Sequence, residues 1–211
     1  MKHATLRPRF GHSVLLLALA SSLVQAADAL PTIQQQWAHC QYPQTGKAKA
    51  RCLETLSTQA DPASAKEAFR TDLLIWSAIV KSTWAGAKGG LGALSLVKEA
   101  KAKLEIAIKQ DPKALEGSAY TSLGSLYYQV PGWPVGFGDD DKAEQLLKQA
   151  LAINPTGIDP NFFYGDFLLE QGDKAQAKIY LDKALAAPAR PGRETADEGR
   201  KTEIRERLAK L

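Results

Sequence analysis

The chain has 211 residues, of which 45% are hydrophobic, and it carries 27 basic and 23 acidic side chains. Three basic residues and no acidic residue lie within residues 1–26, so the rest of the chain has 24 basic and 23 acidic side chains. This balance argues against a nucleic-acid partner, which would require a clear excess of basic residues. The 185 residues after position 26 suffice for one domain with a continuous core.

Residues 1–26 have the pattern of a signal peptide. Three basic residues precede an apolar run at 13–24, which is too short to span a bilayer, and Val24-Gln25-Ala26 resembles a signal peptidase site. We therefore expect export to the periplasm as a soluble protein, with no stable membrane insertion after cleavage. The alternative is that the segment stays attached as an anchor.

Two cysteines, Cys40 and Cys52, lie twelve positions apart on either side of an expected turn at Pro43–Gly46. In an oxidising compartment, cysteines on neighbouring helices are expected to form a disulfide. A redox-active dithiol is the alternative, but such sites usually place the cysteines two residues apart at a helix start. The spacing favours a structural disulfide.

The rest of the chain shows helical patterns, and no segment has the period of a strand. Asp61-Pro62 is interpreted as a junction between helices, because a residue before proline disfavours the helical conformation. The fold class expected is all-α, with about nine helices. They are expected near residues 31–42, 46–60, 62–84, 91–110, 113–129, 140–153, 158–171, 173–187 and 195–210.

A self-match at an offset of 34 residues indicates a repeat. Small residues at fixed positions let two antiparallel helices pack closely, and this period is that of the tetratricopeptide repeat. We therefore predict a tetratricopeptide-repeat-like α-solenoid over 27–211, with divergent helices at 27–89, repeats at 90–188 and a capping helix within 189–211. Four alanines should be buried where helices cross: Ala143, Ala150, Ala177 and Ala184.

The segment Gln129–Asp141 interrupts the repeat with about seven extra residues. Insertions in repeat proteins often lie on the binding face. Trp133 and Phe137 stand in this loop, where large apolar side chains need a reason to be ordered. They either plug the end of a groove or form a recognition surface or pocket.

The expected ligand- or partner-binding residues are the aromatic and polar side chains around this loop and the next helix. They are Tyr127, Tyr128, Trp133, Phe137, Asn161, Tyr164 and Asp166. No nucleophile elbow or nucleotide-binding motif occurs, so we expect no enzyme, no catalytic residue and no cofactor. We also expect no metal site, because the acidic run 139–141 is explained by capping of the helix that follows.

With its export signal, its repeat and the run Val130-Pro131-Gly132 to Lys142-Ala143, the chain resembles periplasmic tetratricopeptide-repeat proteins. It looks most like the TRAP transporter T-component family over roughly residues 90–190. The resemblance implies a helical solenoid that binds a solute-binding partner, with a small ligand in a pore or groove, and it leaves assembly as a homo-oligomer such as a trimer open. Those proteins are typically lipid-anchored, and this chain lacks the cysteine for that.

Two hypotheses for function follow. The first is an exported scaffold that mediates protein–protein interaction, including a role as a transport accessory, because stacked helices make an extended binding surface. The alternative is a small-molecule-binding module with an aromatic pocket at the Gln129–Asp141 loop. A long open groove would favour the first hypothesis, and a closed cavity near Trp133 would favour the second.

Overall fold

The computed structural model describes Met1 and residues 28–211, so the predicted signal peptide lies almost entirely outside the described residues. Within 28–211 the chain forms nine α-helices and one short 3-10 helix, which confirms the all-α prediction. The helices are α1 (Ala29–Gln41), α2 (Gly46–Lys66), α3 (Thr71–Lys88), α4 (Leu91–Gln110), η1 (Ala114–Gly117), α5 (Ser118–Gln129), α6 (Asp140–Ile153), α7 (Ile158–Glu170), α8 (Lys174–Leu185) and α9 (Glu194–Leu208).

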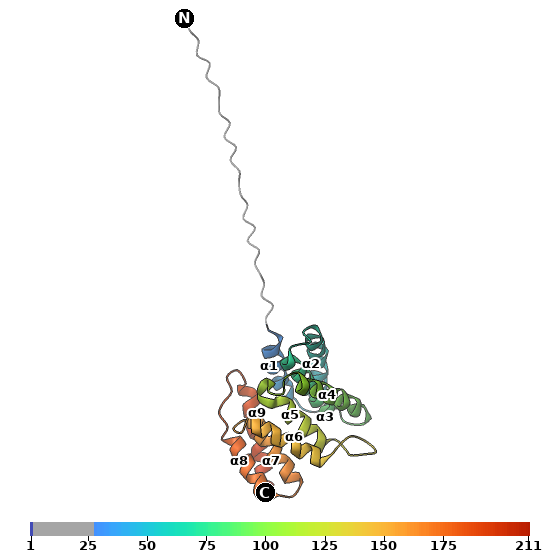
Figure 1. The fold of residues 1–211 in the computed structure, drawn as a ribbon, viewed down its shortest axis with the longest axis vertical. Helices are drawn as coiled ribbons and strands as arrows, with labels where there is room; N and C mark the ends of the chain where they lie inside the picture. The colour runs from blue at the N-terminus through green and yellow to red at the C-terminus, as the bar shows by residue number, and fades with distance from the viewer. Residues whose placement is uncertain (2–27) are drawn as a thin grey trace.

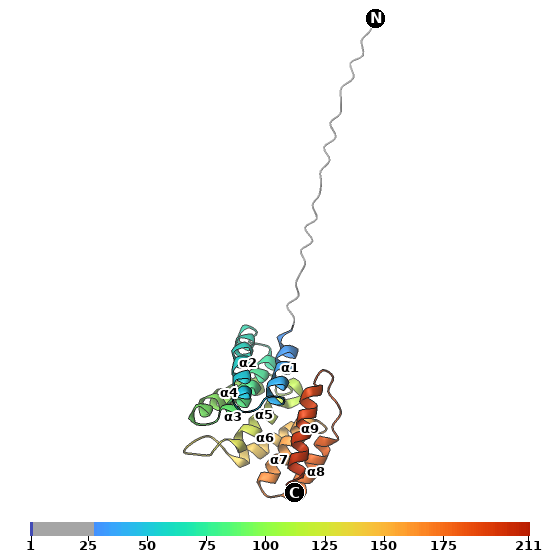
Figure 2. The same cartoon turned by 180° about the vertical axis from the view of Figure 1, so that it is seen from behind.

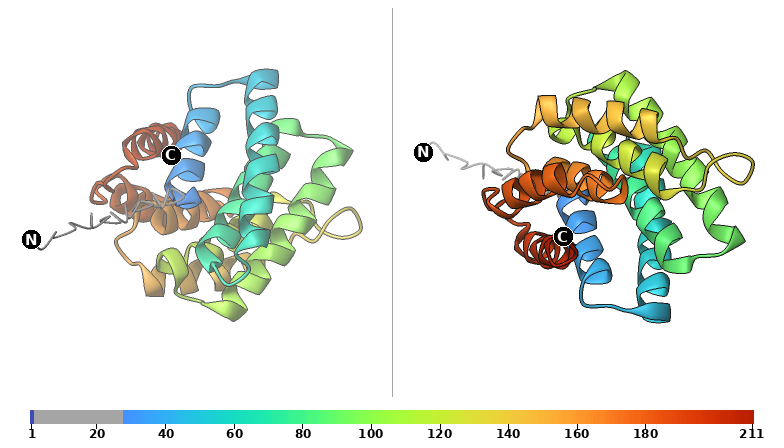
Figure 3. Two further views of the ribbon diagram at one scale, coloured as in Figure 1. Left: turned by 90° about the horizontal axis from the view of Figure 1, so that it is seen from above. Right: turned by 90° about the horizontal axis from the view of Figure 1, so that it is seen from below.

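The helices form antiparallel pairs, α3 with α4, α5 with α6 and α7 with α8, as a helical repeat requires (Figure 1). Each helix contacts the next one along the chain, and the last helix, α9, also contacts the first, α1. Figure 2 shows α1 and α9 near each other from behind, and both views of Figure 3 show them side by side. The solenoid is therefore closed into a ring, and its concave face encloses a space.

Small residues set the spacing within the helix pairs. A Cβ atom at Gly124 would lie 2.8 Å from Leu147, and one at Gly165 would lie 2.9 Å from Leu181, so neither position has room for a side chain. The burial predicted for the repeat alanines is confirmed. The following four have no exposed surface: Ala143, Ala150, Ala177 and Ala184.

One predicted junction is wrong, because α2 continues through Pro62 as far as Lys66. Proline in a helix removes one backbone hydrogen bond. The preceding Asp61 is held by tertiary contacts, since its carboxylate accepts hydrogen bonds from Ser77 at 2.5 Å and from Lys103 at 2.7 Å. Contacts with α3 and α4 thus outweigh the local preference, and the chain turns at residues 67–70 instead.

The two N-terminal helices are joined to each other by a covalent bond and to the rest of the ring by close packing. Cys40 and Cys52 form a disulfide with a Cα–Cα distance of 5.5 Å, as predicted, and this bond links α1 to α2. Directly after α1, the ring of Tyr42 would lie 2.2 Å from a Cβ atom on Gly199 of α9. The helix expected only to cap the stack therefore packs tightly on the start of the domain.

Candidate binding cavity and the projecting loop

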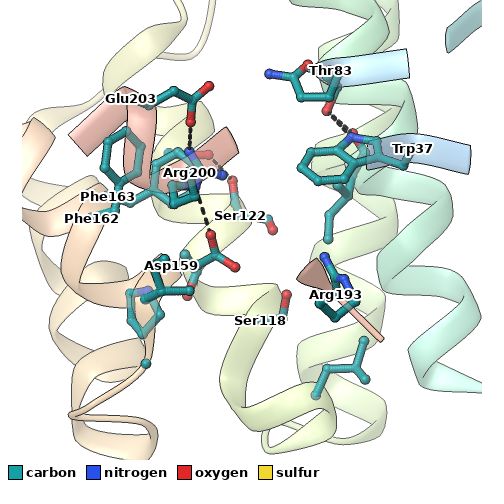
Figure 4. Close-up of a pocket in the computed structure, with 18 of the residues that line it drawn as sticks. Trp37, Thr83, Ser118, Ser122, Asp159, Phe162, Phe163, Arg193, Arg200 and Glu203 are labelled. Atoms are coloured by element: carbon teal, nitrogen blue, oxygen red, sulfur yellow. Dashed lines mark hydrogen bonds and ion pairs between the residues drawn. The ribbon is translucent and has the colours of Figure 1, made fainter. Parts of the chain in front are cut away.

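The concave face forms a cavity of about 940 Å³ that is partly open to solvent. Its walls come mainly from the odd-numbered helices α1, α3, α5, α7 and α9, together with the turn that precedes α9 (Figure 4). This volume lies at the upper end of the range for small-molecule sites, which is about 300 to 1,000 Å³. The cavity exists because α9 returns to α1, and an open solenoid would present a groove there.

One side of the cavity is aromatic and another is rich in hydroxyl groups. Trp37 and Trp76 pack edge to face with ring centroids 5.5 Å apart, and the indole N–H of Trp37 donates to Thr83 at 3.0 Å. The α5 wall carries Ser118 and Ser122, four residues apart and therefore on the same face of the helix. A ligand would thus find flat apolar surfaces and hydroxyl groups in the same space.

An ionic network holds α9 and its preceding turn against α7. The carboxylate of Asp159 lies 2.7 Å from Arg190 and 2.9 Å from Arg200, and Arg190 also pairs with Asp197 at 2.5 Å. Burial raises the pKa of Asp159, but the guanidinium groups of Arg200 and Arg190 outweigh burial and lower the pKa to about 2. The network therefore stays ionised at neutral pH and closes the ring.

A second buried carboxylate, Asp166, connects α7 with α5 and α9. It forms an ion pair with Arg207 and accepts a hydrogen bond from the hydroxyl of Tyr128 at 3.0 Å. Burial and the negative charge of Asp166 raise the pKa of Tyr128 well above its usual value, so this phenol stays protonated and can donate. Asp166 reaches the cavity wall with its charge already balanced.

The inserted loop projects from the body of the protein (Figure 1). Its base is pinned, because the backbone N–H of Asp139 donates to Tyr127 at 2.9 Å and the ring of Phe137 packs on the ring of Tyr127 at 5.5 Å. The side chain of Asp139 caps α6 through the N–H of Lys142 at 2.9 Å, as expected. At the tip, Trp133 is 90% exposed.

The seven predicted binding residues lie in different places. Asp166 lines the cavity, and Tyr128 of α5 donates a hydrogen bond to Asp166. Asn161 is fully buried and donates to the carbonyl groups of Pro155 and Gly157, so it supports the start of α7. The remaining residues lie at the loop or between helices: Trp133 at the tip, Tyr127 and Phe137 at the base, and Tyr164 packed between α6 and α8.

Sequence reasoning missed the arginines that face the cavity. Arg190, Arg193 and Arg200 lie in the turn before α9 and in its first half, within a region that was interpreted only as a cap. The signal available was the run Arg190-Pro191-Gly192-Arg193, which places two long cations in a tight turn between helices. Nothing in that run indicates that α7 supplies the partner of Arg190, Asp159, which lies 31 residues earlier.

A family model described as Tetratricopeptide repeat matches residues 136–191, which extend from the end of the loop through α8 to the turn before α9. No curated protein matches the chain. In the part of the chain that the structure describes, no helix has the length and apolar character needed to cross a membrane. The family match, together with the helix pairs and their buried small residues, supports a tetratricopeptide-repeat protein.

Proposed function

We propose that this protein is an exported, non-catalytic scaffold of the periplasm that binds a partner protein through the tip of the Gln129–Asp141 loop. Tetratricopeptide repeats commonly mediate protein–protein interaction, and the matched family is generally not catalytic. The pattern of residues 1–26 supports export. The resemblance to the T-component family extends the proposal to a transport accessory whose partner is a solute-binding protein.

The exposure of Trp133 on a pinned loop carries this proposal. A tryptophan side chain that is 90% exposed contributes little to the stability of the fold. Its presence at this position is better explained by a contact with another molecule. Val135, 60% exposed, extends the apolar tip. Because the base of the loop is already ordered, binding at the tip would cost little conformational entropy.

Co-purification from periplasm tests the proposal. A tagged wild-type protein is compared with Trp133→Ala and with a control variant, Phe69→Ala. Phe69 is 86% exposed and lies in the turn between α2 and α3. We expect Trp133→Ala to weaken binding of the partner by about 2 kcal/mol, roughly thirtyfold in Kd. Phe69→Ala should bind the partner as tightly as the wild type does. Equal recovery of the same proteins by all three would refute the role of the loop.

A second candidate function, binding of a small molecule, is favoured by the volume of the cavity on the concave face, which is partly open to solvent. The sequence hypothesis placed such a pocket at the Gln129–Asp141 loop, whereas the 940 Å³ cavity lies between the odd-numbered helices on the concave face. The two functions are compatible, because the loop tip and the cavity are separate surfaces. Retention of a small molecule after gentle purification, detected by mass spectrometry of the denatured protein, would support this second function.

A further inference from the structure

Among the four arginines that line the cavity, Arg193 is the one without an ion pair within residues 28–211. It stands directly before α9, lines the cavity, and its guanidinium carbon lies 4.7 Å from the centroid of the Trp76 ring. Within residues 28–211 its side chain forms no ion pair and no hydrogen bond, and its Nε atom is buried without a partner. The guanidinium therefore contacts the Trp76 ring and leaves its hydrogen-bonding capacity unused.

The other three arginines of the cavity wall have their charges balanced within the chain. Arg190 and Arg200 share Asp159, and Arg207 pairs with Asp166. Leaving a buried charge without a counter-charge is costly, which is why buried charges in proteins are normally paired. Burial and the nearby charge of Arg190 lower the pKa of Arg193 by more than the negative charges of Asp159 and Asp197 raise it.

We propose that Arg193 binds the carboxylate of a small organic monocarboxylic acid whose flat or apolar body occupies the cavity beside Trp76. A planar guanidinium presents parallel N–H groups that match the two oxygens of a carboxylate. This inference rests on the second candidate function, the binding of a small molecule in the cavity.

The charges around Arg193 favour one negative charge on the ligand. The cavity wall carries five basic and five acidic side chains, so it has no large positive excess that would attract a dianion such as phosphate. Across the space from Arg193, Figure 4 shows Asp159 and Glu203 with Arg200 between them, so a second negative charge would meet carboxylates there.

The remaining walls fit the rest of such a molecule. Ser118 lines the same cavity as Arg193 and brings a hydroxyl group that can donate to a polar ligand (Figure 4). Ser118 is also the first residue of α5, which has no side-chain cap, and the positive end of the helix dipole there favours a negative charge. Trp37 and Phe162 line opposite sides of the cavity (Figure 4), and the guanidinium of Arg200 lies 4.4 Å from the centroid of the Phe162 ring.

The test uses matched pairs of acids and amides with the purified protein. Benzoate, 3-phenylpropionate and hexanoate are each compared with the corresponding amide by thermal shift and by calorimetric titration, and inorganic phosphate serves as a dianion. We expect at least one acid to bind at least about tenfold more tightly than its amide and than phosphate. Arg193→Gln should abolish this preference, and Arg193→Lys should retain part of it.

Arg205→Gln is the matched control, because it removes an exposed positive charge from α9, outside the cavity, where Arg205 pairs with Glu198. It should bind the acids like the wild type, and circular dichroism should show that all three variants are folded. Acids that bind no better than amides or phosphate, or that bind Arg193→Gln undiminished, would overturn the inference and leave ligand binding in the cavity standing. If no acid and no amide binds, both the role of Arg193 and the binding of such small molecules in the cavity are refuted.

Discussion

The projecting loop and the cavity are built in opposite ways. The loop is one contiguous segment whose base is pinned by neighbours within about a dozen positions, such as Phe137 on Tyr127. The cavity is assembled from helices that begin at α1 and end at α9, and Asp159 reaches partners 31 and 41 positions away. A local sequence pattern can therefore reveal the loop, whereas only the closure of the ring reveals the cavity.

This difference has a thermodynamic consequence. Perturbing the contact between α1 and α9 should loosen the cavity and leave the loop intact, because the loop base contacts α5 and α6. Changing the loop tip should leave both the cavity and the stability of the domain unchanged, since the tip buries almost no surface. The four predictions below test this independence, in order of decreasing effect on stability.

The largest effect is expected from removing the disulfide. The double variant Cys40→Ser, Cys52→Ser should destabilise the protein by about 3 kcal/mol, because the bond closes a short loop in the unfolded chain. For a domain of this size the melting temperature should fall by roughly 6 to 12 °C. Calorimetry of the oxidised wild type and the variant measures this, with reduced wild type as the control. Equal melting temperatures would show that α1 is held by packing alone.

Gly199→Ala tests the contact between α9 and α1. The added methyl group would meet the Tyr42 ring at 2.2 Å, so the helices must separate, at a cost of about 1 to 3 kcal/mol. Gly86→Ala is the control, because its Cβ would meet nothing within 4 Å inside α3. Chemical denaturation should show a loss for the first variant and none for the second. If Gly199→Ala is neutral, the two helices are not closely packed in solution.

Acid should weaken the same closure through Asp159. Its pKa is about 2 in the folded protein and about 3.9 in an unfolded chain. The lowered folded pKa means that the ionised carboxylate stabilises the fold above the unfolded pKa, and that this contribution is lost as pH falls towards 2. Asp159→Asn should therefore be less stable than wild type at pH 7, by about 2 kcal/mol. The difference should shrink between about pH 5 and pH 2. A constant difference over that range would contradict the role of Asp159.

The smallest effect on stability is expected from Trp133→Ala. Because the side chain is 90% exposed, the free energy of unfolding should change by less than about 0.5 kcal/mol, and the helix content should not change. Binding of an acid in the cavity should also be unaffected. A fall of several degrees in the melting temperature would show that the tryptophan packs on the domain in solution, which is the alternative interpretation of the loop as a plug.

Part of this molecule is determined by local sequence. The spacing of Ala143, Ala150, Ala177 and Ala184 predicted burial at helix crossings, and all four have no exposed surface. A small side chain at each crossing is needed for close packing of two helices, so the requirement is visible in the sequence itself. The Cys40–Cys52 pair was predictable for a similar reason, because two helices joined by a short turn must lie close together.

The rest was decided by contacts between residues far apart in the chain. Helix α2 continues through Pro62 because Ser77 and Lys103 hold Asp61, which a rule about the residue before proline cannot anticipate. The cavity likewise depends on the packing of α9 against α1. Arg193 has an unused guanidinium because Asp159 is already shared by Arg190 and Arg200, and only the closed ring brings these side chains together.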